Sequence, residues 1–209
     1  MKKIKKIKKL VVLCVVICFA FSANAQQGSL KFGLNYNYSF PMSGFKKDLV
    51  SNNSPRGFMG ELMYSFNDKL AGGLLFGFQD YYQKYPRAIY HLTNTQDISA
   101  VLSNSIQTTP VLLKAKYFLT PSSYIKPYVS LAAGANLIDF KQYFGEFGNS
   151  TTSVGFRAQG GLGVLIPFKK TSASGINIGA SYDYAPYKKN GYKDLNTVNL
   201  QAGVVIELR

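Results

Sequence analysis

The chain has few of the residues on which most active sites and disulfides depend. Of its 209 residues, two are cysteine and one is histidine. Both cysteines, Cys14 and Cys18, lie within the first 25 residues. If that segment is removed on export, the rest of the chain has no disulfide and no thiol chemistry. With one histidine and no cysteine left, we expect no metal site and no cofactor.

Long hydrophobic runs are missing as well. The apolar run Leu10–Phe21 is shorter than the ~18 residues that a membrane-spanning helix requires. Six lysines precede it, and the small-x-small triplet Ala23-Asn24-Ala25 follows it. A basic start, a short apolar run and such a triplet are typical of a cleaved secretory signal peptide. We therefore expect residues 1–25 to be a signal peptide and residues 26–209 to form one domain.

Acidic residues are scarce, with 10 Asp and Glu against 24 Lys and Arg. Six of the basic residues belong to the expected signal peptide. The remaining excess is scattered, in short clusters such as Lys46-Lys47 and Lys188-Lys189. A nucleic-acid-binding surface needs clustered cations interleaved with aromatic side chains. We therefore expect no nucleic-acid partner, whereas these lysines could meet lipid phosphates at a membrane surface.

What the chain does have is an apolar period of two. In residues 197–209 every even position is apolar, and nearly every odd one is polar or small. This pattern predicts a β-strand with one dry face and one wet face. Its length matches the about 9–11 residues of a strand that crosses a bilayer, whereas a soluble strand is usually about 5–6 residues long. Closing the sheet into a barrel would leave no unpaired edge.

The same alternation recurs along the chain and predicts eight strands. They are expected in Leu30–Phe40, Phe58–Phe66, Leu70–Tyr82, Thr109–Tyr117, Ile125–Ile138, Val154–Ile166, Ile176–Tyr184 and Thr197–Arg209. Short connections are expected at Asn67–Lys69, Thr120–Tyr124 and Pro167–Ser174, and long loops at Pro41–Arg56, Gln83–Ile106, Asp139–Thr152 and Ala185–Lys193. Strictly alternating long and short connections are typical of an up-and-down transmembrane barrel. We therefore predict an all-β, eight-stranded antiparallel barrel with both chain ends on the short-turn side.

Alternation alone does not say which face is wet. A soluble lipocalin-like barrel would place its apolar residues inward, around a ligand. Aromatic residues near the strand ends favour a membrane barrel, because they resemble the girdles at bilayer interfaces. The polar face carries charges of both signs, as expected for a narrow interior filled with paired side chains. We predict a polar network in the lumen from Glu61, Lys114, Lys116, Arg157, Asp183 and Glu207.

Several segments resemble the PorT-like outer-membrane β-barrel domain family. They are Thr109–Phe118, Lys126–Gly134 and the end of the chain, where Gln201, Gly203, Ile206 and Leu208 follow a polar-x-Gly-x-x-apolar-x-apolar pattern. The resemblance covers essentially the whole chain after residue 25. It implies a location in the outer membrane, contact with its lipids, and recognition of the last strand by the barrel assembly machinery. Many such proteins end in an aromatic residue, whereas this chain ends in Leu208-Arg209.

These residues favour a structural, adhesive or accessory role over catalysis. Glu61 and Asp183 are more simply explained by ion pairing than as a catalytic carboxylate pair. Eight strands leave an interior that side chains fill, so a narrow pore for ions or small solutes is the alternative. A secreted ligand-binding barrel is a third hypothesis. An envelope protein partner could dock on the longest loop, through Tyr85, Arg87, Tyr90 and His91.

Overall fold

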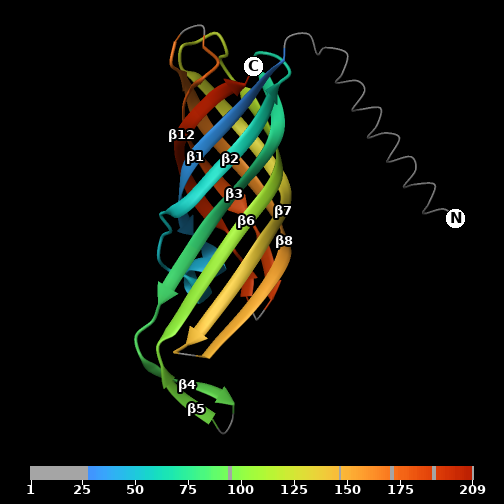
Figure 1. Cartoon of the computed structure of the whole chain (residues 1–209). Helices are drawn as coiled ribbons and strands as arrows, with labels where there is room; N and C mark the ends of the chain where they lie inside the picture. The colour runs from blue at the N-terminus through green and yellow to red at the C-terminus, as the bar shows by residue number, and fades with distance from the viewer. Residues whose placement is uncertain (1–27, 94–95, 146, 170–171, 190–191, 209) are drawn as a thin grey trace, which may run out of the picture.

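The protein folds as a closed barrel of eight antiparallel β-strands (Figure 1). The computed structural model describes residues 28–93, 96–145, 147–169, 172–189 and 192–208. The expected signal peptide, residues 1–25, lies outside the described residues. The barrel strands are β1 (Ser29–Pro41), β2 (Arg56–Ser65), β3 (Leu70–Lys84), β6 (Leu102–Phe118), β7 (Lys126–Phe144), β8 (Phe147–Pro167), β9 (Gly175–Tyr184) and β12 (Thr197–Leu208).

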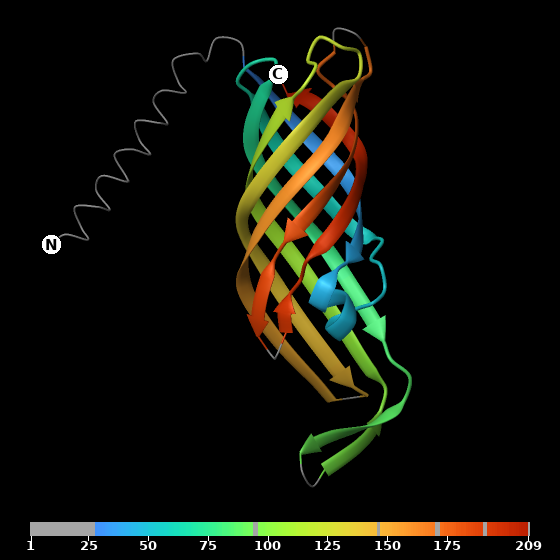
Figure 2. The ribbon, with the colours of Figure 1, turned by 180° about the vertical axis from the view of Figure 1, so that it is seen from behind.

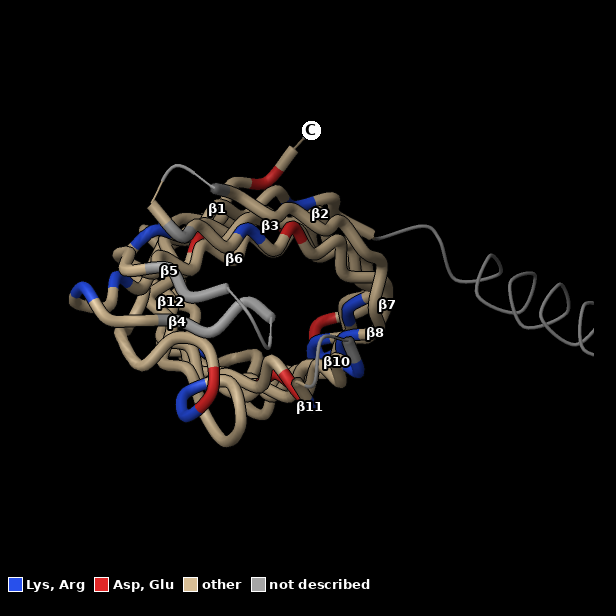
Figure 3. Tube along the Cα trace, turned by 90° about the horizontal axis from the view of Figure 1, so that it is seen from below, with Lys and Arg blue, Asp and Glu red and all other residues tan. Residues whose placement is uncertain are grey.

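Strands that follow one another along the barrel wall are paired, and the last strand closes the barrel against the first. β1 pairs with β2 on one side and with β12 on the other, where Leu30 lies opposite Leu208 and Pro41 opposite Thr197. The strands form a complete ring when the barrel is viewed along its axis (Figure 3). Each strand therefore pairs its backbone N–H and C=O groups with neighbours on both sides, as a lipid environment requires.

The predicted alternation separates a polar interior from an apolar exterior. In β12, Asn199 is fully buried while the adjacent Leu200 is 51% exposed. Leu34, Val111 and Ile178 also point outward and are exposed. Such a surface suits the hydrocarbon of a bilayer, whereas a lipocalin-like barrel would turn these residues inward. The structure therefore confirms the transmembrane barrel and rules out the soluble barrel as the fold.

The two rims of the barrel differ in how the strands are connected. One rim, which we call the turn rim, carries the short connections 66–69, 119–125 and 168–174, as predicted. β1 begins and β12 ends at this rim, which was also predicted. The opposite rim, which we call the hairpin rim, carries the four segments predicted to be long loops. There the structure corrects the prediction, because most of these residues are in strands or a short helix.

Two of the four segments contain small hairpins. Residues 83–106 include the end of β3, a hairpin of β4 (Ala88–Thr93) and β5 (Gln96–Ala100), and the start of β6. Residues 185–193 include a hairpin of β10 (Pro186–Lys189) and β11 (Tyr192–Asp194). The first segment, 41–56, contains the π-helix η2 (Phe45–Leu49), which lies near the second hairpin (Figure 2). No helix in the described part of the chain is both long and apolar enough to cross a membrane.

The remaining segment, 139–152, is not a loop. β7 and β8 run through it and stay paired until Phe144 lies opposite Phe147. Most outward side chains of this extension are polar, and Thr152 donates a hydrogen bond to Asp139 across 2.6 Å. Polar residues suit the outside of a barrel where it stands clear of hydrocarbon. The prediction ended each strand where its outward apolar residues ended, and it therefore missed the extension.

Candidate functional site

Three buried charged side chains form what we call the inner cluster: Glu61 of β2, and Lys114 and Lys116 of β6. Lys114 Nζ lies 3.0 Å from Glu61 Oε2, and Lys116 Nζ bonds to Glu61 Oε1. The two lysines are two positions apart, so they point to the same face of the strand. On β3, which lies between β2 and β6, Gly73 is opposite Lys114. Glu61 reaches across β3 to these lysines, and Gly33, which lies opposite Glu61 on β1, leaves room for it, because a Cβ at Gly33 would lie 2.7 Å from Glu61 Cγ.

The inner cluster lies between two apolar layers of the lumen. The first, which we call the middle layer, consists of Met59, Leu75, Leu112 and Ala132. The second lies nearest the turn rim, and we call it the lower layer. It consists of Met63, Ala71, Phe118, Tyr128, Leu165 and Val205. Consecutive inward positions along β2 produce this order, since Met59, Glu61 and Met63 succeed one another. Charges enclosed in this way interact strongly, because little water screens them.

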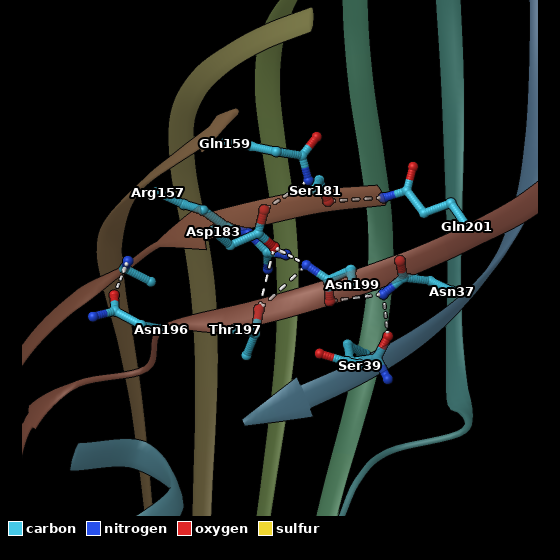
Figure 4. A network of polar contacts seen from close by, with 12 residues as sticks. Asn37, Ser39, Arg157, Gln159, Ser181, Asp183, Asn196, Thr197, Asn199 and Gln201 are labelled. Carbon is cyan, nitrogen blue, oxygen red and sulfur yellow. Dashed lines mark hydrogen bonds and ion pairs between the residues drawn. The ribbon is translucent and has the colours of Figure 1, made fainter. Parts of the chain in front are cut away.

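A second set of charges, which we call the outer cluster, joins Arg157 of β8 to Asp183 of β9 (Figure 4). Both side chains are at most 3% exposed. Asp183 also accepts hydrogen bonds from Gln159 Nε2 at 2.8 Å and Asn199 Nδ2 at 2.7 Å, and a longer one from Thr197. The strand register places Gln159 and Thr197 directly opposite Asp183 on its two neighbouring strands. Cross-strand neighbours on one face are close enough to bond in this way.

Amide side chains extend both clusters across the lumen. Near the outer cluster, Asn37 Nδ2 donates to Gln79 Oε1 at 2.7 Å. Near the inner cluster, Asn177 Nδ2 donates to Asn35 Oδ1 at 2.8 Å, and Tyr128 Oη donates to Asn177 Oδ1 at 2.8 Å. These amides were not among the predicted lumen residues, although their positions on the inward face of the strands identify them. With them, side chains from opposite walls meet and fill the barrel.

The hairpin rim is closed by a third apolar cluster, which we call the mouth cluster. It consists of Phe45, Leu49, Val50, Tyr81, Ile106, Ile138, Phe140, Ala185, Tyr187 and Leu195. Helix η2 contributes Phe45, whose ring lies 4.8 Å from that of Tyr81. The backbone carbonyl of Leu49 accepts hydrogen bonds from Tyr85 Oη at 3.2 Å and Asn104 Nδ2 at 3.1 Å. At the edge of the cluster, burial raises the pKa of the Tyr192 phenol.

The structure brings five of the six predicted lumen residues into these two clusters. The sixth, Glu207, lies opposite Lys31 in the β1–β12 register and forms no ion pair with any described side chain. At the end of the chain, Gln201 points into the lumen and donates to Ser181 at 3.4 Å. Gly203 lies on the same face of β12 as Gln201. By contrast, Ile206 and Leu208 point outward and are exposed.

The four residues predicted to dock a partner lie in different settings. Tyr85 is half-buried and holds η2 through the Leu49 carbonyl, so it belongs to the mouth of the barrel. Arg87 is exposed just before β4. Tyr90 and His91 lie in β4, but their side chains are outside the described part of the structure. Within the described residues, no group of three or more His, Cys, Asp or Glu side chains could hold a metal ion.

An apolar exterior around a closed antiparallel barrel defines an integral outer-membrane β-barrel protein. Residues 11–207 match the family described as outer membrane protein beta-barrel domain, and the chain belongs to that family. The protein therefore resides in the outer membrane, in contact with its lipids. Outer-membrane barrels carry short turns on the periplasmic side, so the turn rim faces the periplasm and the hairpin rim faces outward.

Solved structures with the same kind of barrel are only distantly similar. Ail of Yersinia pestis, solved in complex with the heparin analogue sucrose octasulfate, is 20% identical with a TM-score of 0.44, covering 86% of this chain and 97% of Ail. Outer membrane protein OprG of Pseudomonas aeruginosa is 14% identical with a TM-score of 0.49, covering 87% and 96%. Neisserial surface protein A is 16% identical with a TM-score of 0.47, covering 87% and 97%. No curated protein matches the chain. Similarity at this level does not bear on function.

Proposed function

We propose that this protein is a non-enzymatic outer-membrane anchor that presents its hairpin rim to a partner, in a structural, adhesive or accessory role. One observation carries the proposal: the lumen is filled at successive levels, while the β4–β5 hairpin extends beyond the barrel (Figure 1). The buried charges are engaged with one another, as in a packed core rather than a catalytic site. The part of the molecule free to meet other molecules is therefore its outer rim.

The partner that fits this proposal is an envelope or extracellular protein. Ile89 on β4 is 66% exposed, and Arg87 is exposed beside it. Each strand of an isolated two-stranded hairpin also has an unpaired edge that can accept a further strand. The proposal includes contact of the exposed Lys46, Lys47 and Lys188 with lipid phosphates of the outer leaflet.

Site-specific crosslinking in intact cells tests the proposed partner. A photo-crosslinking residue at Ile89 is expected to yield a discrete protein adduct. The matched control is the same residue at Tyr124, which is 51% exposed at the turn rim. Adducts from Tyr124 alone, or from neither position, would overturn the proposal.

A narrow pore is the competing function, and the packing of the lumen argues against it. Ions would have to pass the mouth cluster, the outer cluster and both apolar layers. In planar bilayers we expect the purified protein to show no steady conductance. A steady conductance that changes when Arg157 or Lys114 is replaced by alanine would refute the closed lumen.

The proposal includes finer points about export and family. We infer that residues 1–25 are removed as a signal peptide, and that residues 26–209 form the mature barrel domain. We also infer that the chain is PorT-like, on the strength of Thr109–Phe118 and Lys126–Gly134. The assembly machinery would recognise the last strand through Gln201, Gly203, Ile206 and Leu208. Intact mass of the mature protein tests the cleavage site, and slower assembly of Leu208→Asn would support the recognition signal.

A further inference from the structure

A cavity lies in the lumen at the level of the lower layer. Its volume is about 20 Å³, which suffices for roughly one water-sized species. All six side chains of the lower layer line it, so its walls are mainly apolar. The polar and charged side chains that line it are those of Lys31, Glu61, Ser65, Lys116 and Asn177.

The charges around this cavity do not balance. Each oxygen of Glu61 is already bonded to a lysine, one to Lys114 and one to Lys116. A third cation, Lys31, lines the cavity and forms no ion pair with a described side chain. Glu207 lies opposite Lys31 in the strand register but does not line the cavity. This group therefore has three ammonium groups against one carboxylate, and an excess of charge of one sign in a partly buried site is costly.

The donors that face the cavity are suited to an anion. Lys116 Nζ has one hydrogen bond to Glu61 and lies 4.7 Å from the centre of the Tyr128 ring. An ammonium group has three donors, so Lys116 has donors left for a further partner. Lys31 and the hydroxyl of Ser65 add others. The side-chain amide of Asn177, by contrast, is already bonded within the protein, because its Nδ2 donates to Asn35 and its Oδ1 accepts from Tyr128.

We propose that this cavity binds one small monovalent anion, chloride in the cell, between Lys31 and Lys116. Lys31, Lys114 and Lys116 exceed Glu61 by two positive charges, and a single negative charge would offset one of them. The small volume and the apolar walls favour a small, weakly hydrated ion. This inference is independent of the partner proposed for the hairpin rim, because it concerns the opposite end of the lumen.

Thermal unfolding of the mature protein in detergent tests the proposal. The melting temperature is measured in sodium chloride, sodium bromide and sodium gluconate at equal ionic strength. We expect a saturable rise of about 2–4 °C in both halides relative to gluconate, because an ion that binds only the folded state stabilises it. Lys31→Gln should remove this rise. Lys31 is only half-buried and lies outside the Glu61 ion pairs, so this variant is expected to fold.

The matched control is Lys169→Gln, an exposed lysine in the short connection after β8. This control loses the same charge at the same rim and should keep the halide effect. A second measurement is diffraction from crystals grown in bromide, where an anomalous peak is expected beside the ammonium groups of Lys31 and Lys116. Equal melting temperatures in all three salts, a halide effect that survives Lys31→Gln, or no peak in the cavity would each overturn the proposal.

Discussion

The two charged clusters of the lumen each enclose one buried carboxylate, but they pair it in different ways. In the outer cluster, one guanidinium meets one carboxylate, and amide and hydroxyl donors complete the shell around Asp183. In the inner cluster, two ammonium groups share Glu61, and no amide bonds to that carboxylate among the described contacts. The outer cluster is balanced in charge, whereas the inner cluster has an excess of positive charge.

This difference affects how much each cluster contributes to the stability of the barrel. A balanced pair whose carboxylate is also bonded by neighbouring amides fixes the positions of three adjacent strands, β8, β9 and β12. A cluster with excess charge depends on something further, either solvent or a bound ion. Removing a cation should therefore be costly in the outer cluster and cheap in the inner one.

The largest effect is expected from Arg157→Met. It leaves Asp183 as a buried charge without a counter-charge, although its amide and hydroxyl donors remain. Breaking a buried pair from one side typically costs about 3–5 kcal/mol. The free energy of unfolding, from urea titration in detergent or lipid, should fall by that amount.

The double variant Arg157→Met with Asp183→Leu is the control for the ion pair. It removes both charges, so it should recover a large part of the lost stability. It should not recover all of it, because Gln159 and Asn199 lose their acceptor. If the double variant were as unstable as Arg157→Met, unpaired charge would not be the cause.

A smaller effect is expected when a cation is placed on the other face of the wall. Leu200→Arg puts a guanidinium against lipid, where neither kind of cluster is available to pair it. Near the bilayer midplane this should cost about 2–4 kcal/mol, and near the interface about 0–1 kcal/mol. Leu30→Arg, at the turn rim, is the matched control at the interface. Equal losses in the two variants would mean that the cost of a charge on the outward face does not depend on its depth in the bilayer.

The sequence contains enough to predict the barrel and its two faces. A strict period of two, as in Leu34, Asn35, Tyr36 and Asn37, assigns each residue to one side of the wall. It also indicated that the inward charges would pair. The period does not indicate which charges meet, because that depends on how the strands are staggered around the barrel. Glu61 reaches Lys114 and Lys116 of β6 across β3, and no local pattern predicts that contact.

Two further features escaped prediction for physical reasons. The apolar layers are built from residues such as Leu75 and Leu112, which sit on the face that was assigned to polar groups. Their role depends on meeting other inward apolar side chains from distant strands. The strand extensions beyond the membrane escaped because outward polarity was taken to end a strand. There the outward face is mostly polar and faces water, and strand pairing continues without an apolar outward face.

Lys114→Met is expected to have only a slight effect, and so contrasts directly with Arg157→Met. It removes one of the two lysines on Glu61 and leaves Lys116 to balance the carboxylate. The lost charge-assisted hydrogen bond is worth about 1.5–3 kcal/mol, but removal of the excess positive charge offsets most of that loss. The change in the free energy of unfolding should therefore stay within about 1 kcal/mol. A loss as large as that of Arg157→Met would show that the inner cluster needs both lysines.

The smallest effect is expected at the exposed ion pair of Arg56 and Asp80, which joins the same two chemical groups as the buried pair of the outer cluster. Arg56 and Asp80 lie opposite each other on β2 and β3, with Arg56 Nη1 3.0 Å from Asp80 Oδ2, but the Arg56 side chain is 61% exposed. Water already solvates this guanidinium, so Arg56→Gln should cost about 0–1 kcal/mol. The same urea titration used for Arg157→Met measures it. Because both pairs join a guanidinium to a carboxylate, the difference between the two variants isolates the effect of burial. Similar losses would mean that the strength of the outer cluster does not come from its enclosure.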